Sequence, residues 1–211
     1  LTVMLLVDVS GSRNFGTLSQ MKRDMMAEVA ATLAFSTIAN NDKVGVVFFS
    51  NKIEKYIPAQ KGKTHVLHII RELLSFEPTS KGTDMAQALQ YFANAQKRHC
   101  TAFLISDFIG TGAVDKPLLI ASNRHEVNAI QIYDRREAEL PNIGLVKFHD
   151  AESNSNLWID TSLATIRNNY AQAWKQNQDS LEQLFTRTGV KHVSVRTDED
   201  YVKALMHLFR C

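Results

Sequence analysis

Short runs of apolar residues alternate along the chain with longer stretches in which apolar residues recur at helical spacing. A strand covered on both faces reads as a continuous apolar run, whereas an amphipathic helix repeats its apolar positions every three or four residues. Their alternation predicts an α/β fold with a doubly wound, mostly parallel sheet and helices on both faces. The predicted strands are 1–7, 44–49, 53–57, 101–106, 127–133 and 190–195.

The predicted helices differ in how much of their surface is apolar. Residues 18–39 carry many alanines between larger apolar side chains, so this helix should be buried over much of its circumference, with its methionines filling the core. A long amphipathic helix should end at Gly189, because glycine readily adopts the left-handed conformation of a helix C-cap. The other predicted helices are 65–74, 84–95, 117–124 and 198–209.

Two segments depart from the parallel pattern. Residues 53–57 carry Lys and Glu and end at Pro58, as expected of an antiparallel edge strand. Residues 134–160 contain turn-forming Pro and Gly followed by two strand-like pieces, 145–149 and 157–159. This second pattern predicts a β-hairpin insertion rather than a second domain.

Length and composition indicate one globular domain, residues 1–211, since single domains commonly reach about 200 residues. The net charge of +2 is too small to indicate binding to nucleic acid or to an anionic membrane. Two cysteines fit a reducing compartment, and no apolar run approaches the ~20 residues of a membrane span, so we expect a cytoplasmic protein. The sequence starts without Met in a predicted central strand. We therefore expect the full-length protein to have a further N-terminal region, which could attach it to a membrane.

Oxygen-bearing side chains gather where predicted strands end. Asp8, Ser10 and Ser12 follow the first strand at alternate positions, and Asp107 follows a later buried strand. In a doubly wound sheet, the binding crevice lies at the carboxyl ends of the strands where the strand order reverses. The loop that contains Thr83 should reach the same edge. These five residues form a predicted site composed of oxygen donors.

Magnesium is the cation that this set of donors fits best, since Mg²⁺ prefers octahedral oxygen ligation and retains several waters. Zinc or copper would favour imidazole or thiolate ligands, which the set lacks. Mn²⁺ or Ca²⁺ could substitute for Mg²⁺. Neutral hydroxyl ligands and an open coordination position predict weak affinity for the free ion.

The stretch Asp8-Val9-Ser10-Gly11-Ser12 resembles the metal-ion-dependent adhesion site of von Willebrand factor A domains, whose motif has the form Asp-x-Ser-x-Ser. Over nearly its whole length the chain is also similar to one bacterial branch of these domains, the DUF58 family. The segments that carry this similarity are Asp42-Lys43-Val44-Gly45-Val46-Val47-Phe48, Lys81-Gly82-Thr83-Asp84, Ile105-Ser106-Asp107-Phe108, Asp134 to Pro141, and Thr197-Asp198 to Arg210.

This resemblance implies a non-enzymatic protein-binding module. It implies that hydroxyl groups ligate Mg²⁺ directly, that two carboxylates bind it directly or through water, and that an Asp or Glu of a partner protein fills the open position. The hydroxyl ligands would be Ser10, Ser12 and Thr83, and the carboxylates Asp8 and Asp107. Members of the DUF58 branch are often encoded beside MoxR-type AAA+ ATPases, so the implied partner is such an ATPase in a chaperone-like system.

Three further residues are candidate partner contacts. Many relatives have a small residue or Met where this chain has Arg13, whose guanidinium could clamp a partner carboxylate or point to solvent. Asp134 and Glu137 leave a predicted strand on the same edge as Asp107 and could contact a partner. The alternative for this pair is a solvated turn beside two arginines.

Two other functions stay open. The same cation could serve a phosphoester hydrolase or a phosphoryl-transfer enzyme, with His125 or His149 as a helper. Against this, the sequence has no phosphate-binding Gly-x-x-x-x-Gly-Lys motif and no second carboxylate two residues after Asp8. The other alternative is a scaffold without a functional ion, in which Asp8 and Asp107 cap turns and water or a lysine screens their repulsion.

Overall fold

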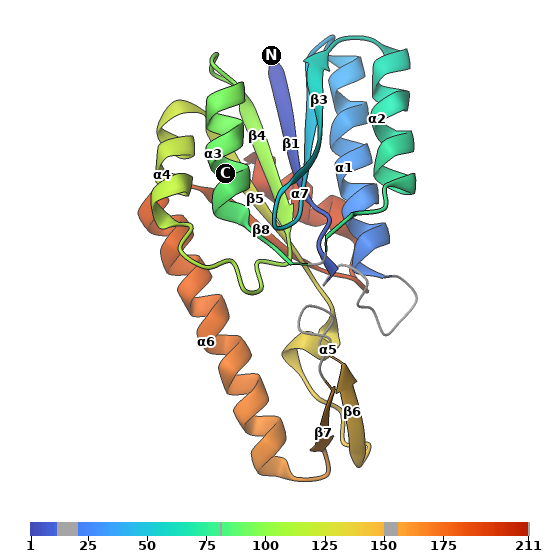
Figure 1. Ribbon diagram of the computed structural model, residues 1–211, viewed down its shortest axis with the longest axis vertical. Helices are drawn as coiled ribbons and strands as arrows, with labels where there is room; N and C mark the ends of the chain where they lie inside the picture. Colours follow the sequence, from blue (N-terminus) through green and yellow to red (C-terminus); the bar gives the residue numbers. More distant parts are fainter. Residues whose placement is uncertain (12–20, 81, 150–155, 211) are drawn as a thin grey trace.

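The computed structural model describes residues 1–11, 21–80, 82–149 and 156–210. Its centre is a six-stranded sheet in the order β3-β2-β1-β4-β5-β8, in which β3 is antiparallel to β2 and the other neighbours are parallel (Figure 1). These strands are β1 (Thr2–Asp8), β2 (Lys43–Phe49), β3 (Ile53–Gln60), β4 (Thr101–Ser106), β5 (Glu126–Tyr133) and β8 (Lys191–Arg196). The predicted mostly parallel sheet with one antiparallel edge strand is confirmed.

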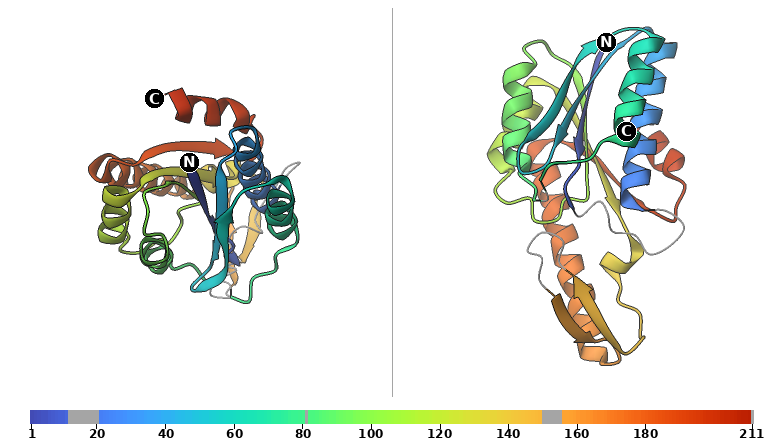
Figure 2. Two further views of the ribbon diagram at one scale, coloured as in Figure 1. Left: turned by 90° about the horizontal axis from the view of Figure 1, so that it is seen from above. Right: turned by 45° about the vertical axis from the view of Figure 1, so that its right-hand side comes forward.

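Helices cover both faces of the sheet (Figure 2). They are α1 (Lys22–Ala39), α2 (Lys63–Ser75), α3 (Met85–Ala95), α4 (Asp115–Arg124), α6 (Ala164–Thr188) and α7 (Tyr201–Arg210). Successive side chains of a strand point to opposite faces. Leu5 and Val7 of β1 accordingly pack in the core with α1, α2 and α7, whereas Met4 and Leu6 pack in the core with α3, α4 and α6. No helix in the described part of the chain is both long and apolar enough to cross a membrane.

The edge strand β3 continues through Pro58 to Gln60, so the prediction that it ends at Pro58 is wrong. Opposite Gly45, β3 has two residues where β2 has one, which is a β-bulge. Proline is compatible with this position because an edge strand at a bulge need not donate every backbone hydrogen bond. Gly45 is required there, since an added Cβ would lie 2.8 Å from both the amide nitrogen of Ala59 and the carbonyl oxygen of Ile57.

A projecting lobe follows β5 at the carboxyl edge of the sheet (Figure 1). It contains the short helix α5 (Arg135–Ala138), the antiparallel hairpin of β6 (Leu145–His149) and β7 (Asn156–Asp160), and the N-terminal half of α6. The fully buried side chains of α6 lie near its C-terminal end, from Leu181 to Thr188, so its N-terminal half extends away from the sheet.

Trp174 and Tyr170 of α6 contact the end of β5 and the helix α5, respectively. The ring of Trp174 lies 5.3 Å from the ring of Tyr133 at the end of β5. The hydroxyl group of Tyr170 donates a hydrogen bond of 3.2 Å to the carbonyl oxygen of Arg136 in α5. The lobe is therefore attached beside the carboxyl ends of the parallel strands, where the predicted site also lies.

Candidate metal site

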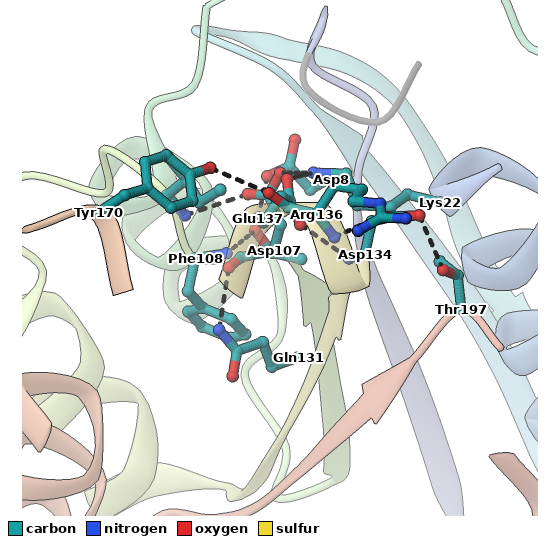
Figure 3. Close-up of polar contacts among 12 residues, drawn as sticks. Asp8, Lys22, Asp107, Phe108, Gln131, Asp134, Arg136, Glu137, Tyr170 and Thr197 are labelled. Atoms are coloured by element: carbon teal, nitrogen blue, oxygen red, sulfur yellow. Dashed lines mark hydrogen bonds and ion pairs between the residues drawn. The ribbon is translucent and has the colours of Figure 1, made fainter. Parts of the chain in front are cut away.

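The strand order reverses at β1, since β2 and β3 lie on one side of it and β4, β5 and β8 on the other. In this class of sheet, such a reversal opens a crevice at the carboxyl ends of the two central strands. Asp8 is the last residue of β1, and Asp107 directly follows β4. The structure therefore brings the two predicted carboxylates to the reversal point (Figure 3).

Asp8 is buried, with 1% of its surface exposed. Its Oδ1 accepts a hydrogen bond of 2.9 Å from the amide of Ser10, and its Oδ2 accepts one of 2.7 Å from the hydroxyl group of Ser106. Burial, together with the charge of Asp107, raises the pKa of Asp8 to about 6 from an ordinary value of 3.8. The hydrogen bonds to Asp8 thus orient its carboxylate but offset only part of the effect of burial and of Asp107 on its pKa.

Asp107 lies in a tight turn that leaves β4. Its Oδ1 accepts a hydrogen bond of 3.0 Å from the amide of Ile109, and the amide of Phe108 donates to the Ser106 hydroxyl group at 3.0 Å. Phe108 has a left-handed φ of 56°, which costs a non-glycine residue roughly 1–2 kcal/mol. Burial of its ring against Phe185 of α6, at 5.3 Å, offsets this strain and fixes the direction of the turn.

The other predicted ligands are at the same edge or outside the described residues. Ser10 is buried two residues after β1. The loop of Thr83 reaches this edge because the amide of Asp84 donates to the carbonyl oxygen of Ser50, directly after β2. Ser12, together with the candidate partner contact Arg13, lies outside the described residues.

Glu54 holds the loop before Thr83 against the sheet, a role that the sequence did not indicate. Its carboxylate accepts hydrogen bonds from the hydroxyl groups of Ser50 and Thr79, both at 2.7 Å, and from the amide of Ser80 at 3.1 Å. Burial raises the pKa of Glu54, but the hydrogen bonds from Thr79 and Ser50 together have the larger effect and bring this pKa below its ordinary value. Glu54 is therefore held as a carboxylate that positions this loop.

Lys22 contacts the predicted site, although the sequence did not indicate it. Its side chain is fully buried, and its Nζ donates to Asp107 Oδ2 at 2.7 Å and to Glu137 Oε1 at 2.5 Å (Figure 3). Burial alone lowers the pKa of Lys22, but the charges of Asp107 and Glu137 raise it above its ordinary value. A buried lysine thus screens one of the two central carboxylates, which is the arrangement that the scaffold alternative requires.

Asp134 and Glu137 are held inside the structure, so the solvated turn expected for them is wrong. They form a capping box on α5, in which Asp134 accepts from the amide of Arg136 and Glu137 accepts from the amide of Asp134, both at 2.8 Å. Asp134 is fully buried and also accepts a hydrogen bond of 3.1 Å from the hydroxyl group of Thr197. Burial raises the pKa of Glu137, and Lys22 opposes this effect. A part for this pair in partner binding stays a prediction, and for Asp134 it must be indirect.

Of the two histidines considered as catalytic helpers, His125 is not beside Asp8 in the fold. His125 precedes β5, at the opposite end of the sheet from Asp8, and its Nδ1 lies 3.6 Å from the sulfur of Cys100. Burial lowers the pKa of His125, so the neutral imidazole is favoured. His149 is the last residue of β6 in the projecting hairpin.

The residues at the reversal point fit a hard divalent cation. Asp8 and Asp107 offer carboxylate oxygens, Ser10 offers a hydroxyl group, and the raised pKa of Asp8 indicates negative charge that Lys22 leaves uncompensated. No three His, Cys, Asp or Glu side chains within the described ranges are grouped so that they could hold a metal ion. An ion at this site would therefore depend on hydroxyl groups, water and a partner carboxylate as well as on Asp8 and Asp107.

A family model described as protein of unknown function DUF58 matches residues 1–180. The uncharacterized protein Mb1516 of Mycobacterium bovis is 31% identical over 206 residues, which cover 96% of this chain and 64% of that protein. The uncharacterized protein MAV169 of Mycobacterium avium is 28% identical over 158 residues, which cover 73% and 92%, respectively. The chain thus spans about 64% of the length of the first of these relatives.

Solved structures with the same fold include the hypothetical protein BatB from Bacteroides thetaiotaomicron, with a TM-score of 0.62, 14% identity and coverage of 100% of both chains. The von Willebrand factor A domain of SpRpn10 has a TM-score of 0.51 and 12% identity, with coverage of 99% of this chain and 93% of that domain. At such identities the likeness concerns the fold alone. The chain is a member of the DUF58 family, and its fold is that of a von Willebrand factor A domain.

Proposed function

We propose that this chain is a cation-dependent protein-interaction module, in which Mg²⁺ bound at Asp8 and Asp107 recruits an acidic residue of a partner protein. The observation that carries the proposal is the burial of Asp8 beside Asp107 at the reversal point, with uncharged hydrogen-bond donors on Asp8. A divalent cation would compensate the charge that these donors leave uncompensated. Membership of a family with a von Willebrand factor A fold supports an interaction role, since that fold generally serves protein binding.

Three hydroxyl groups and two carboxylates would hold the ion. Ser10, Ser12 and Thr83 would be direct ligands, and Asp8 and Asp107 would bind it directly or through water. Mg²⁺ would supply positive charge and an exchangeable coordination position for the partner carboxylate. Mn²⁺ or Ca²⁺ would be accepted by the same oxygen atoms. Since the turns after β1 and β4 already orient both carboxylates, the protein would need little reorganisation to bind the ion.

The partner in this proposal is a MoxR-type AAA+ ATPase that presents an Asp or Glu, and the two proteins work as a chaperone-like pair in the cytoplasm. Arg13 and Glu137 would be further contacts of the partner, with Arg13 binding the incoming carboxylate. The module itself is not an enzyme. The position of His125 at the far end of the sheet supports this, because a general base must reach the reacting group.

A titration with Mg²⁺ tests the metal site. At an Mg²⁺ concentration ten times Kd, the melting temperature of the wild type should rise by about 3 °C. Asp8→Asn should abolish most of this rise, whereas Glu28→Gln, which changes an exposed carboxylate of α1, should retain it. An equal response of the wild type and Asp8→Asn would rule out the proposed site.

A pull-down with the purified ATPase tests the partner. Capture should require Mg²⁺, fail in EDTA and weaken in Ser10→Ala, while Ser36→Ala on the exposed side of α1 should behave as the wild type. Capture that ignores EDTA and Ser10→Ala would keep the ATPase as a partner but remove the metal from the mechanism.

A scaffold without a functional ion is the second candidate function, and the ion pair between Lys22 and Asp107 favours it. In that case Mg²⁺ and EDTA leave the melting temperature unchanged, and the ATPase binds through another surface. The Mg²⁺ titration therefore separates the two candidates before any partner is used.

A further inference from the structure

Lys22 is an unusual residue for the place that it occupies. It is the first residue of α1, where the amide groups of the helix end disfavour a positive charge. Its side chain is fully buried on a helix whose neighbouring inward residues, Met25 and Met26, are apolar. Burying an ammonium group is unfavourable unless carboxylates compensate it. The charge of Lys22 is therefore explained by its two partners rather than by the helix.

These partners belong to different parts of the molecule. Asp107 is a proposed ligand at the end of β4, whereas Glu137 lies in α5, at the base of the projecting lobe (Figure 3). The second carboxylate oxygen of Glu137 accepts a hydrogen bond from the amide of Asp134 and so caps α5. The carboxylate of Asp134 in turn accepts a hydrogen bond from the hydroxyl group of Thr197, which follows β8. The single ammonium group thus connects the proposed ion site to the element that carries the lobe.

We propose that Lys22 is an internal competitor for the divalent cation, and that it couples occupancy of the ion site to α5. The inference rests on the proposed function. Without the ion, Lys22 neutralises Asp107. When a divalent cation binds Asp107, the two positive charges repel each other, and Lys22 shifts its interaction toward Glu137. Stronger pairing with Glu137 then stabilises the capping box of α5.

This arrangement predicts that substitutions of Lys22 and of Glu137 change the affinity for a divalent cation in opposite directions. Lys22→Met removes the competing charge while keeping an unbranched apolar stem, so Mn²⁺ measured by calorimetry should bind about tenfold more tightly. Lys22→Arg keeps the charge and should bind Mn²⁺ within about threefold of the wild type. Glu137→Gln removes the negative charge that competes with Asp107 for Lys22, so Lys22 pairs more strongly with Asp107 and Mn²⁺ should bind at least about threefold more weakly.

A matched control separates this competition from a general loss of negative charge. Glu139→Gln makes the same change two residues later at an exposed position and should leave Mn²⁺ affinity unchanged. In the Lys22→Met background, Glu137→Gln should lose most of its effect, because no competing cation remains to be released. If Lys22→Met does not fold, weaker binding by Glu137→Gln than by Glu139→Gln supports the inference, and equal binding overturns it.

The structural part of the coupling has its own readout. Saturating Mg²⁺ should slow amide hydrogen exchange in α5 of the wild type, whereas the exchange rate in Lys22→Met should not respond. Protection of α5 that is the same in both proteins would overturn the coupling.

Failure of this inference differs from failure of the proposed site. If the wild type and Lys22→Met bind Mn²⁺ with the same measurable affinity, the site stands and Lys22 is only a structural ion-pair partner. If neither protein binds Mn²⁺, the proposed function and this inference both fail. Binding by Lys22→Met alone would support competition in its strongest form.

Discussion

The hydroxyl group of Ser106 donates a hydrogen bond of 2.7 Å to Oδ2 of Asp8 and so ties the end of β4 to the end of β1. The hydroxyl oxygen of Ser106 in turn accepts a hydrogen bond of 3.0 Å from the amide of Phe108, which links this contact to the left-handed turn. Ser106 is fully buried and was not among the residues that the sequence indicated. It orients a proposed ligand without being one.

Replacing Ser106 by Ala should destabilise the fold by about 1–3 kcal/mol, because the amide of Phe108 and a carboxylate oxygen of Asp8 both lose a buried partner. The free energy of unfolding in urea measures this loss. Ser36→Ala, on the exposed side of α1, is the matched control and should change stability by less than about 0.5 kcal/mol. A Ser106→Ala protein as stable as this control would contradict the role given to Ser106.

Acid should stabilise the metal-free protein through Asp8. The pKa of Asp8 is about 6 in the fold and 3.8 ordinarily, so the ionised form is disfavoured by folding. Its contribution opposes stability fully above about pH 6 and disappears as the pH falls below about 4, with a magnitude on the order of 3 kcal/mol.

Urea unfolding in EDTA across this pH range should therefore show a gain at low pH in the wild type that is missing in Asp8→Asn. The comparison with Asp8→Asn is needed because His125, whose pKa is lowered by burial, contributes with the opposite sign. Parallel stability curves for the two proteins would show that Asp8 has an ordinary pKa.

Glu54→Gln should weaken Mg²⁺ binding although Glu54 is not a proposed ligand. Glutamine keeps one acceptor oxygen and has an NH2 group in place of the other, so it cannot accept from both Thr79 and Ser80, and the loop that carries Thr83 is less well positioned. Residues that orient metal ligands commonly contribute about tenfold or more to affinity. Calorimetric titration with Mn²⁺ should show such a loss for Glu54→Gln and none for Glu28→Gln, and equal affinities would remove Thr83 or its loop from the site.

Gly45→Ala should destabilise the fold by about 1–3 kcal/mol, because its Cβ would lie 2.8 Å from backbone atoms of β3. Gly82→Ala is the matched control, since the nearest atom to its Cβ would be the Cβ of Asn51 at an ordinary 3.7 Å. Thermal unfolding of the two variants measures the difference. A melting temperature for Gly45→Ala equal to that for Gly82→Ala would show that β3 can move away from β2 at no cost.

Most of the sheet could be predicted from the sequence because its strands are continuous apolar runs that are buried on both faces. The helix α5 was missed because three charged residues and one alanine have no hydrophobic period, and its stability comes from the capping box. The course of β3 beyond Pro58 was missed because a bulge depends on pairing with β2, which local sequence does not reveal.

The candidate site was predictable where it depends on strand ends, as for Asp8 and Asp107. Lys22 was not, because a lysine at the start of a helix normally extends into solvent, and its partners are 85 and 115 residues away in sequence. Thr83 was placed at the correct edge by the order of the elements, whereas the residue that positions its loop, Glu54, required the contacts of β3.

The length of α6 also gives it the geometry of a lever. From Leu181, where it is anchored in the core, back to Ala164, it extends ~25 Å at 1.5 Å per residue. At that radius, a rotation of about 5° about Leu181 moves the N-terminal end of α6 by about 2 Å. The adjoining hairpin carries the exposed side chains of Leu145, Leu157 and Trp158. A rearrangement of one buried ammonium group could thus be amplified into a displacement large enough for another protein to detect.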